Sequence, residues 1–341
     1  MSRFLAAARH QPVDTTPVWL MRQAGRSLPE YRALREHYSL LDIVAEPDLC
    51  AEVTLQPVRR LGVDAAVMFA DIMLPLRGMG VDFDLVEGVG PVIANPVKSA
   101  ADVDRLRLAD GEEAAPQVIT AVRRVVSESP VPVVGFAGAP FTLASYLLEG
   151  RPSRDFSLTK RFMYGEPEAF ERLLGKLAAT MSAYLAAQVR AGAAAVQLFD
   201  SWVGALGPDD YQTLVAPHTR AVFTAIEPLG VPRIHFGTGT AALLEAIADT
   251  GPDLVSLDWR VRLDEGWRRV GLDRGVQGNL DPAVLLAPGE VVQQRAREVL
   301  RRAGGRPGHV FNLGHGVLPE TPLENLQLLV DTVHAGVPIA A

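Results

Sequence analysis

Short, continuous apolar runs alternate along the chain with longer segments of mixed polarity. Eight such runs occupy residues 17–21, 65–70, 131–137, 193–199, 233–236, 254–257, 275–278 and 309–313. Apolar runs of this length are typical of strands that are buried on both faces, as in a parallel sheet. The pattern therefore predicts eight parallel strands spread over the whole chain.

The segments between these runs carry a helical period. After Glu166-Pro167, apolar side chains recur about every 3.6 residues as far as Leu185, and Pro167 suits a first helical turn. A second helix is expected from Pro288 to about Arg302, with arginines in its C-terminal half, where cations favour the helix dipole. Strands that alternate with helices predict one α/β domain over residues 1–341, a (β/α)₈ TIM barrel with its site at the carboxyl ends of the strands.

A doubly wound open sheet is the alternative architecture. Such a sheet usually has a glycine-rich dinucleotide turn after its first strand, and none follows residues 17–21. Residues 81–86 alternate in polarity and, together with residues 90–94, predict a hairpin inserted between the second and third barrel strands.

Composition narrows the choice of partners. Hydrophobic residues make up 48% of the 341 residues, and the net charge is −7. An acidic chain offers no general basic field, so we expect neither nucleic acid nor an anionic membrane as a partner. No apolar stretch reaches the roughly 18 residues of a membrane span. The apolar run at the start of the chain is too short for the signal peptide of a secreted protein. The single cysteine, Cys50, forms no intrachain disulfide. We therefore expect a reduced, cytoplasmic setting.

Two arginines follow the first predicted strand, in the segment Arg22-Gln23-Ala24-Gly25-Arg26. Guanidinium groups capture carboxylates and phosphates through a rigid fork of donors, and a nearby glycine lets backbone approach a ligand closely. The segment therefore predicts an anion-binding mouth. A solvated surface turn is the simpler alternative.

Polar side chains also follow other predicted strands, where a barrel carries its site. The candidates are Asp71, Tyr146, Ser201, His235 and His315. Each has a structural explanation too, because Asp and Ser cap helices, Tyr and His pack into cores, and a His between glycines suits a turn. Their occurrence around one opening favours a binding site.

Six motifs carry a family resemblance. They are Arg22-Gln23-Ala24-Gly25-Arg26, Leu28-Pro29-Glu30-Tyr31-Arg32, Phe69-Ala70-Asp71-Ile72, Gly138-Ala139-Pro140-Phe141-Thr142-Leu143, Gln277-Gly278-Asn279-Leu280-Asp281-Pro282 and Asn312-Leu313-Gly314-His315-Gly316. In these motifs and their order, the whole chain resembles the uroporphyrinogen decarboxylase family.

The resemblance implies an enzyme without cofactor or metal that removes carbon dioxide from the four acetate arms of uroporphyrinogen III, giving coproporphyrinogen III. It also implies a (β/α)₈ barrel and a homodimer with one deep cleft in each subunit. Asp71 would accept hydrogen bonds from the pyrrole N–H groups and stabilise a pyrrole cation. Substrate contacts would come from Arg22, Gln23, Ala24, Gly25, Arg26, Tyr31, Tyr146, Ser201 and His315.

The chemistry explains why such residues are needed. A decarboxylation leaves an electron pair that a cofactor usually accepts, but a pyrrole protonated at a ring carbon can accept it instead. A carboxylate then stabilises the cation, while arginines bind the polyanion. The proton donor stays open between Arg22, His315 and a water, and Arg22 or its water ranks first.

Three other functions compete with this one. Some zinc-dependent methyltransferases are built on the same barrel, but a chain with one cysteine lacks the usual set of thiolate ligands for a zinc site. A porphyrinogen carrier would bind without turnover. A sugar-phosphate enzyme would place phosphate near Gly314-His315-Gly316, although this leaves the arginine segment unexplained.

Overall fold

Seven parallel strands form the central sheet of the computed structural model, which describes residues 2–25, 27–86 and 88–336. Their order is β1-β4-β5-β6-β7-β8-β9, so neighbours in the sheet follow one another along the chain. The strands are β1 (Ala66–Val67), β4 (Val133–Gly138), β5 (Ala195–Asp200), β6 (Arg233–Gly237), β7 (Leu254–Ser256), β8 (Gly275–Leu280) and β9 (His309–Leu313). This sequential parallel order confirms the predicted α/β barrel class.

Residues 17–21 close the barrel between β9 and β1. Val18 forms a parallel bridge with Phe311, and the Phe311 amide donates to the Pro17 carbonyl at 2.8 Å. On the other side, the Val18 amide donates to Oδ2 of Asp64 at 2.7 Å. The prediction of a full strand here is wrong in extent. On this side the Asp64 amide donates to the Val18 carbonyl at 2.8 Å, but the Val18 amide is bound by the Asp64 side chain and not by a backbone carbonyl.

The other predicted strands lie where the apolar runs placed them. The run at 65–70 shortens to the two residues of β1, whereas the run at 309–313 coincides with β9. The inserted hairpin is confirmed as the antiparallel pair β2 (Phe83–Val86) and β3 (Gly90–Ile93). Both predicted helices are confirmed, as α11 (Pro167–Arg190) and, within one residue, α16 (Gly289–Ala303).

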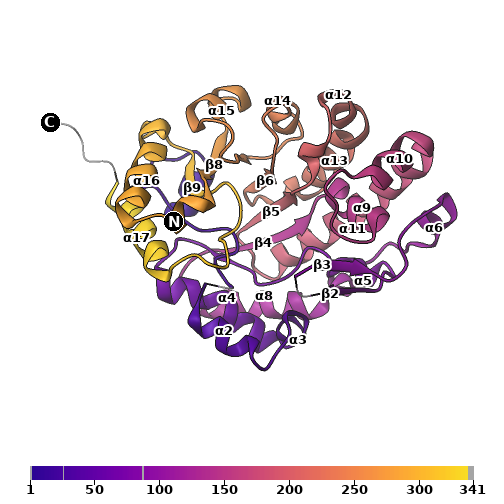
Figure 1. Ribbon diagram of the computed structural model, residues 1–341, viewed down its shortest axis with the longest axis horizontal. Helices are drawn as coiled ribbons and strands as arrows, with labels where there is room; N and C mark the ends of the chain where they lie inside the picture. The colour runs from indigo at the N-terminus through magenta and orange to yellow at the C-terminus, as the bar shows by residue number, and fades with distance from the viewer. Residues whose placement is uncertain (1, 26, 87, 337–341) are drawn as a thin grey trace.

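Helices surround the strands on the outside of the curled sheet, as Figure 1 shows for α4 and α8, α10 to α13, and α14 to α17. The remaining helices are α1 (Arg3–Ala8), α2 (Pro29–Arg35), α3 (Leu40–Ala45), α4 (Pro47–Leu61), α5 (Pro75–Gly78), α6 (Ala100–Arg105), α7 (Gly111–Ala114), α8 (Pro116–Glu128), α9 (Pro140–Glu149), α10 (Ser157–Gly165), α12 (Pro208–Asp210), α13 (Ala216–Ile226), α14 (Leu244–Ala248), α15 (Leu263–Val270) and α17 (Leu323–Ala335). Among the described helices, none is both long and apolar enough to cross a membrane.

A polar network lies inside the barrel. The Trp19 indole donates to Oε1 of Gln277 at 3.0 Å, and the Gln277 amide donates to Gln197 at 2.9 Å and to Ser256 at 3.0 Å. All four side chains are buried, so these bonds fix the relative positions of the strands from which they project.

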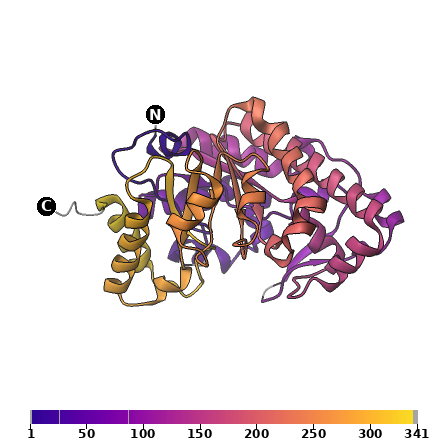
Figure 2. The ribbon, with the colours of Figure 1, turned by 90° about the horizontal axis from the view of Figure 1, so that it is seen from above.

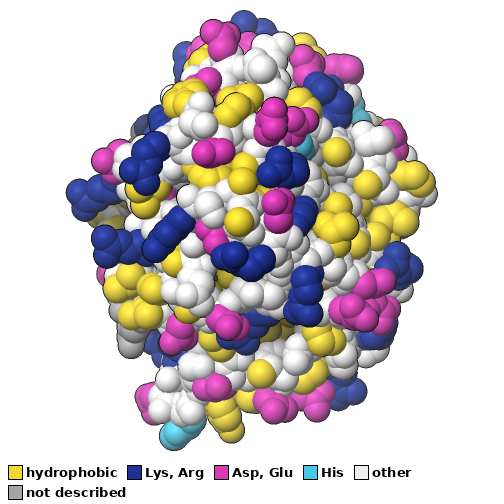
Figure 3. Space-filling model, turned by 90° about the vertical axis from the view of Figure 1, so that its right-hand side faces the viewer, with side chains coloured by type: hydrophobic (Ala, Val, Ile, Leu, Met, Phe, Trp, Pro, Cys, Tyr) yellow, Lys and Arg dark blue, Asp and Glu magenta, His cyan; other side chains and the backbone are white. Residues whose placement is uncertain are grey.

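The two ends of the barrel carry different segments. In Figure 2, α1 and the strands of the β2–β3 hairpin lie on opposite sides of the molecule. The hairpin packs beside the end of α9, where the Ile93 amide donates to the Gly150 carbonyl at 2.8 Å. On the face drawn in Figure 3, Lys and Arg side chains lie interspersed with Asp and Glu, so no basic field covers this face.

Candidate active site at the carboxyl ends of the strands

The loop that carries Arg22 is held in place by its neighbours. The Met21 amide donates to Oδ1 of Asn312 at 3.0 Å, which ties the loop to the end of β9. The Gln23 side chain accepts the Leu20 amide and donates to the Ala65 carbonyl, both at 2.9 Å. Gln23 is therefore buried as a brace, and Arg22 adopts a positive φ of 59° between these two anchors.

The Arg22 side chain lies against the glycine that follows His315. A Cβ built on Gly316 would stand 2.4 Å from Cδ and 2.7 Å from Cγ of Arg22, so only glycine leaves room for this guanidinium stem. The partner arginine of the predicted pair, Arg26, lies outside the described residues.

Asp71 follows β1 and faces the charge of Arg22. Its Oδ1 accepts the Met73 amide at 2.9 Å within the turn before α5. Burial raises the pKa of this carboxyl above 3.8, and the Met73 amide and Arg22 oppose that rise. Asp71 is not the N-cap of the following helix, α5, because Leu74 occupies that position.

Tyr146 projects from α9 toward the same charges. Its ring packs edge-on against Trp202 at 5.9 Å between centroids. Burial and the neighbouring charge of Asp71 raise the pKa of the phenol to about 12, against a smaller lowering by Arg22. The hydroxyl therefore stays protonated at neutral pH and can donate a hydrogen bond.

His315 follows β9 and is neutral at neutral pH. Burial, together with the positive charges of Arg22 and Arg260, lowers its pKa to about 4 against the opposing charge of Asp258. Its Nδ1 accepts the Gly316 amide at 2.6 Å, which leaves the ring proton on Nε2. His315 can therefore be a turn residue, through Nδ1, and still offer its Nε2–H to a ligand.

The structure thus brings Asp71, Tyr146 and His315 each within electrostatic reach of Arg22. Ser201 directly follows β5 and precedes Trp202, the residue that packs on Tyr146. No side-chain hydrogen bond caps the helical turn after Ser201, which removes the structural explanation for its hydroxyl. Tyr31 packs edge-on against Phe69 at 5.4 Å, two residues before Asp71.

His235 belongs to the core, as the structural explanation for it predicts. It is fully buried in β6, packs against Phe223 at 5.5 Å, and has its Nε2 3.6 Å from Oδ2 of Asp200. Cys50 is also a core residue: its thiol donates to the Phe69 carbonyl at 3.0 Å, and burial raises its pKa to about 12.

The sequence analysis missed a charged group at the end of β7. Asp258 is 1% exposed and binds the Arg260 guanidinium at 2.7 Å and the Gly239 amide at 2.6 Å. The signal was available, because these residues directly follow the buried run at 254–257, just as Asp71 follows its own run.

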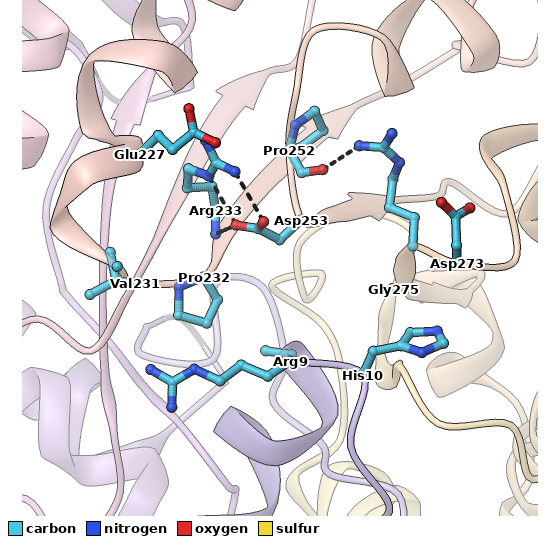
Figure 4. Close-up of a pocket in the computed structure, with 13 residues that line it drawn as sticks. Arg9, His10, Glu227, Val231, Pro232, Arg233, Pro252, Asp253, Asp273 and Gly275 are labelled. Carbon is cyan, nitrogen blue, oxygen red and sulfur yellow. Dashed lines mark hydrogen bonds and ion pairs between the residues drawn. The ribbon is translucent and has the colours of Figure 1, made fainter.

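A recess of about 470 Å³ opens at the other, amino-terminal end of the barrel. Figure 4 shows its lining, where Arg233 pairs with Asp253 through two bonds of 2.9 and 3.0 Å, and Arg9 and His10 lie opposite. The acids of the recess offset its arginines, and this end of a barrel ordinarily serves stability. The recess is therefore a poor match for a polyanion.

Metal ligands are not grouped anywhere in the part of the chain that the structure describes, since no three His, Cys, Asp or Glu side chains come together there. The charged groups described at the carboxyl ends of the strands are Arg22, Asp71, Asp258 and Arg260.

A parallel barrel that gathers a guanidinium, a carboxylate, a phenol and an imidazole at this end defines an enzyme for an anionic small molecule. The profile of the family "Uroporphyrinogen decarboxylase (URO-D)" matches residues 1–336. The chain belongs to the uroporphyrinogen decarboxylase family. The uroporphyrinogen decarboxylases of Streptomyces coelicolor and Sorangium cellulosum are 56% and 55% identical to it, over 98% of this chain and 94% and 96% of theirs.

Solved structures resemble the fold at lower identity. A methyltransferase from Methanosarcina mazei superposes with a TM-score of 0.76 at 20% identity, over 97% of both chains. A B12-independent methionine synthase from Shewanella superposes with a TM-score of 0.57 at 13% identity, over 96% of both chains. These similarities support the shared barrel and nothing about chemistry.

Proposed function

We propose that this protein decarboxylates the four acetate side chains of uroporphyrinogen III to methyl groups, without a cofactor, and releases coproporphyrinogen III. Membership of the family and the names of relatives more than half identical support the reaction. The observation that carries the proposal in this chain is the electrostatic coupling of Arg22 and Asp71, a cation and a carboxylate that face each other at the functional end of the barrel.

Each acetate arm reacts in the same balanced way. A proton added to a pyrrole ring carbon makes the ring an iminium-like cation. The bond between the methylene and the carboxylate then breaks, carbon dioxide leaves, and the bonding electrons enter the ring. A proton added to the methylene carbon gives the methyl group, and loss of the ring proton restores the pyrrole. The arm gains one proton and loses carbon dioxide, so no oxidant or reductant takes part.

Asp71 balances the positive charge of the protonated pyrrole and accepts its N–H. A desolvated carboxylate suits this role, because a charge held in a water-poor site interacts more strongly with a cation that develops beside it. Its Oδ1 is already oriented by the Met73 amide, so little reorganisation is needed when the ring is protonated.

Arg22 binds a carboxylate of the substrate and delivers the ring proton, directly or through a water that it orients. His315 is a weaker candidate for this step than its ordinary pKa suggests, since its lowered pKa of about 4 leaves no imidazolium at neutral pH. Its Nε2–H fits a neutral donor to a substrate carboxylate.

The other predicted contacts complete the grip on the substrate. Tyr146 and Ser201 offer hydroxyl donors, and Ala24 and Gly25 offer backbone at the rim of the arginine loop. Gln23 contributes by bracing that loop, Arg26 by its charge, and Tyr31 by its place near the edge of the macrocycle. We extend the proposal to one barrel domain over residues 1–341, acting as a homodimer in the cytoplasm.

The test is anaerobic incubation with uroporphyrinogen III, oxidation of the products, and separation of the porphyrins by carboxylate number. We expect a series that ends at the tetracarboxylate, with matching release of carbon dioxide. Tight binding of uroporphyrinogen without any loss of carboxylates would contradict the proposal and indicate a carrier.

A further inference from the structure

A second cation stands at the carboxyl ends of the strands, on the His315 side of the site. Arg260 follows β7, and its side chain is 50% exposed. Trp259 connects it to the site, because a Cβ on Gly314 would stand 2.6 Å from the Trp259 amide nitrogen and 2.9 Å from its ring. Arg260 is therefore carried on a residue that packs directly beside the Gly314-His315 turn.

The Arg260 guanidinium is held in a defined position. It stacks over the Trp259 indole at 4.2 Å, and its Nη1 donates to Oδ2 of Asp258 at 2.7 Å. The backbone amides of Gly239 and Arg260 also donate to Asp258, so both oxygens of the carboxylate that holds Arg260 accept hydrogen bonds. Among the described residues, none accepts from Nε or Nη2 of Arg260, which leaves one edge of the fork for a ligand.

The strand order places Arg260 away from the reacting centre. Arg22 follows residues 17–21, which lie between β9 and β1, so it stands between Asp71 after β1 and His315 after β9, whereas Arg260 follows β7, two strands beyond β9. Along this end of the barrel, the groups thus run from Asp71 through Arg22 and His315 to Arg260.

We propose that Arg260 is a further substrate-binding residue, which takes the propionate of a pyrrole ring other than the one that reacts at Asp71. This inference rests on the proposed function. Each ring of the substrate carries one acetate and one propionate, and only the propionates persist through all four decarboxylations. A fixed cation remote from Asp71 holds every intermediate equally well only if it binds a group that the reaction leaves in place.

The experiment compares Arg260→Ala and Arg260→Lys with a matched control, Arg262→Ala. Arg262 lies two residues further on, is 62% exposed, and pairs with Asp264 on the surface. We expect Arg260→Ala to raise KM about tenfold for both uroporphyrinogen III and the pentacarboxylate intermediate, with kcat changed less than twofold. Arg260→Lys should fall between, because it keeps the charge and loses the fork, and Arg262→Ala should match the wild type.

A parallel titration with coproporphyrinogen III, which retains only propionates, separates the two proposals. We expect Arg260→Ala to weaken this binding about tenfold even if the wild-type protein releases no carbon dioxide. Wild-type turnover with Arg260→Ala indistinguishable from Arg262→Ala would overturn the inference and leave the proposed function standing. An increase in KM for uroporphyrinogen III but not for the pentacarboxylate would also overturn it, because the bound group would then be an acetate.

Discussion

At the scale of single residues, the protonation states in the site follow from burial rather than from residue type. Asp71, Tyr146 and His315 each have a pKa shifted toward the neutral form by desolvation. A guanidinium group is not deprotonated in proteins, so Arg22 keeps its charge. The site therefore holds a permanent cation, two neutral hydrogen-bond donors and one acid whose charged form is destabilised by burial.

Asp71→Asn tests the role of that carboxylate. A neutral amide of the same shape cannot balance a pyrrole cation, so we expect kcat to fall about 10²- to 10³-fold, as when a well-aimed electrostatic group is removed. The measurement is the rate of carbon dioxide release, with circular dichroism as the control for folding. Near-normal turnover would contradict the role.

The same variant carries a prediction about stability. Because the folded pKa of Asp71 lies above its ordinary 3.8, the stability that its proton provides is complete below that value and is lost as the pH rises through the folded pKa. We therefore expect Asp71→Asn to melt at or above the wild-type temperature at pH 7, with the difference vanishing in acid. A lower melting temperature at pH 7 alone would show that the charge stabilises the fold.

His315 should stay neutral through the physiological range. Its folded pKa of about 4 lies below the ordinary value of 6.5, so its contribution to stability is present above pH 6.5 and is lost as the pH falls toward 4. Its imidazole NMR signals should not shift between pH 8 and pH 5.5, whereas the same signals in denaturant should titrate near 6.5. A titration near 6.5 in the folded protein would restore His315 as a candidate proton donor.

At the scale of elements, the site depends on the fit between two loops from opposite ends of the chain. The Arg22 loop is anchored by Gln23 and Asn312, and its arginine occupies the space that a side chain at Gly316 would fill. The described residues of the two loops have no regular secondary structure, so these cross-connections maintain the shape of each loop.

Gly316→Ala should therefore act on Arg22 while leaving the fold intact. Its φ is not in the left-handed region, so alanine is compatible with the backbone, but the new methyl displaces Cγ and Cδ of Arg22. We expect KM for uroporphyrinogen III to rise and kcat to fall, each by about tenfold, on the rule that small misplacements of a catalytic group are costly.

Gly175→Ala provides the matched control. Gly175 lies within α11, and a Cβ there would meet no atom within 4 Å. This variant should retain full activity and gain roughly 0.5–1 kcal/mol in the free energy of unfolding. Equal kinetics for the two glycine variants would mean that the Gly316 contact does not position Arg22.

At the scale of the whole molecule, the Asp64 side chain links the segment that closes the barrel to two terminal helices. Asp64 accepts the Val18 amide, contacts Nη1 of Arg3 at 3.4 Å from α1, and accepts Nε2 of His334 at 2.8 Å from α17. It therefore joins both ends of the chain to the strand that carries the arginine loop.

Asp64→Ala should lower the free energy of unfolding by about 2–4 kcal/mol, because it removes the acceptor of the buried Val18 amide and the contacts of this carboxylate with Arg3 and His334. Denaturant titration measures this loss. Asp14→Ala is the control, since Asp14 also pairs with Arg3 but is exposed, and it should change stability little. Similar losses in both variants would mean that the surface pair, not the closure of the barrel, carries the effect.

The sequence by itself determined the order of strands, the helices and the candidate residues at the strand ends. Apolar runs, the helical period and the positions of polar residues after each run are local properties, so they survive without knowledge of distant contacts. The same local patterns predicted the hairpin and α11. Asp258 and Arg260 also lie just after an apolar run, 254–257, so their positions carry the same local signal.

Only the tertiary structure decided how these parts meet. Three features depend on residues far apart in the chain. They are the contact of Asp64 with Val18 where the barrel closes, the neutral state of His315, and the packing of Arg22 against Gly316. Burial and electric fields are sums over such neighbours, and no local pattern contains them.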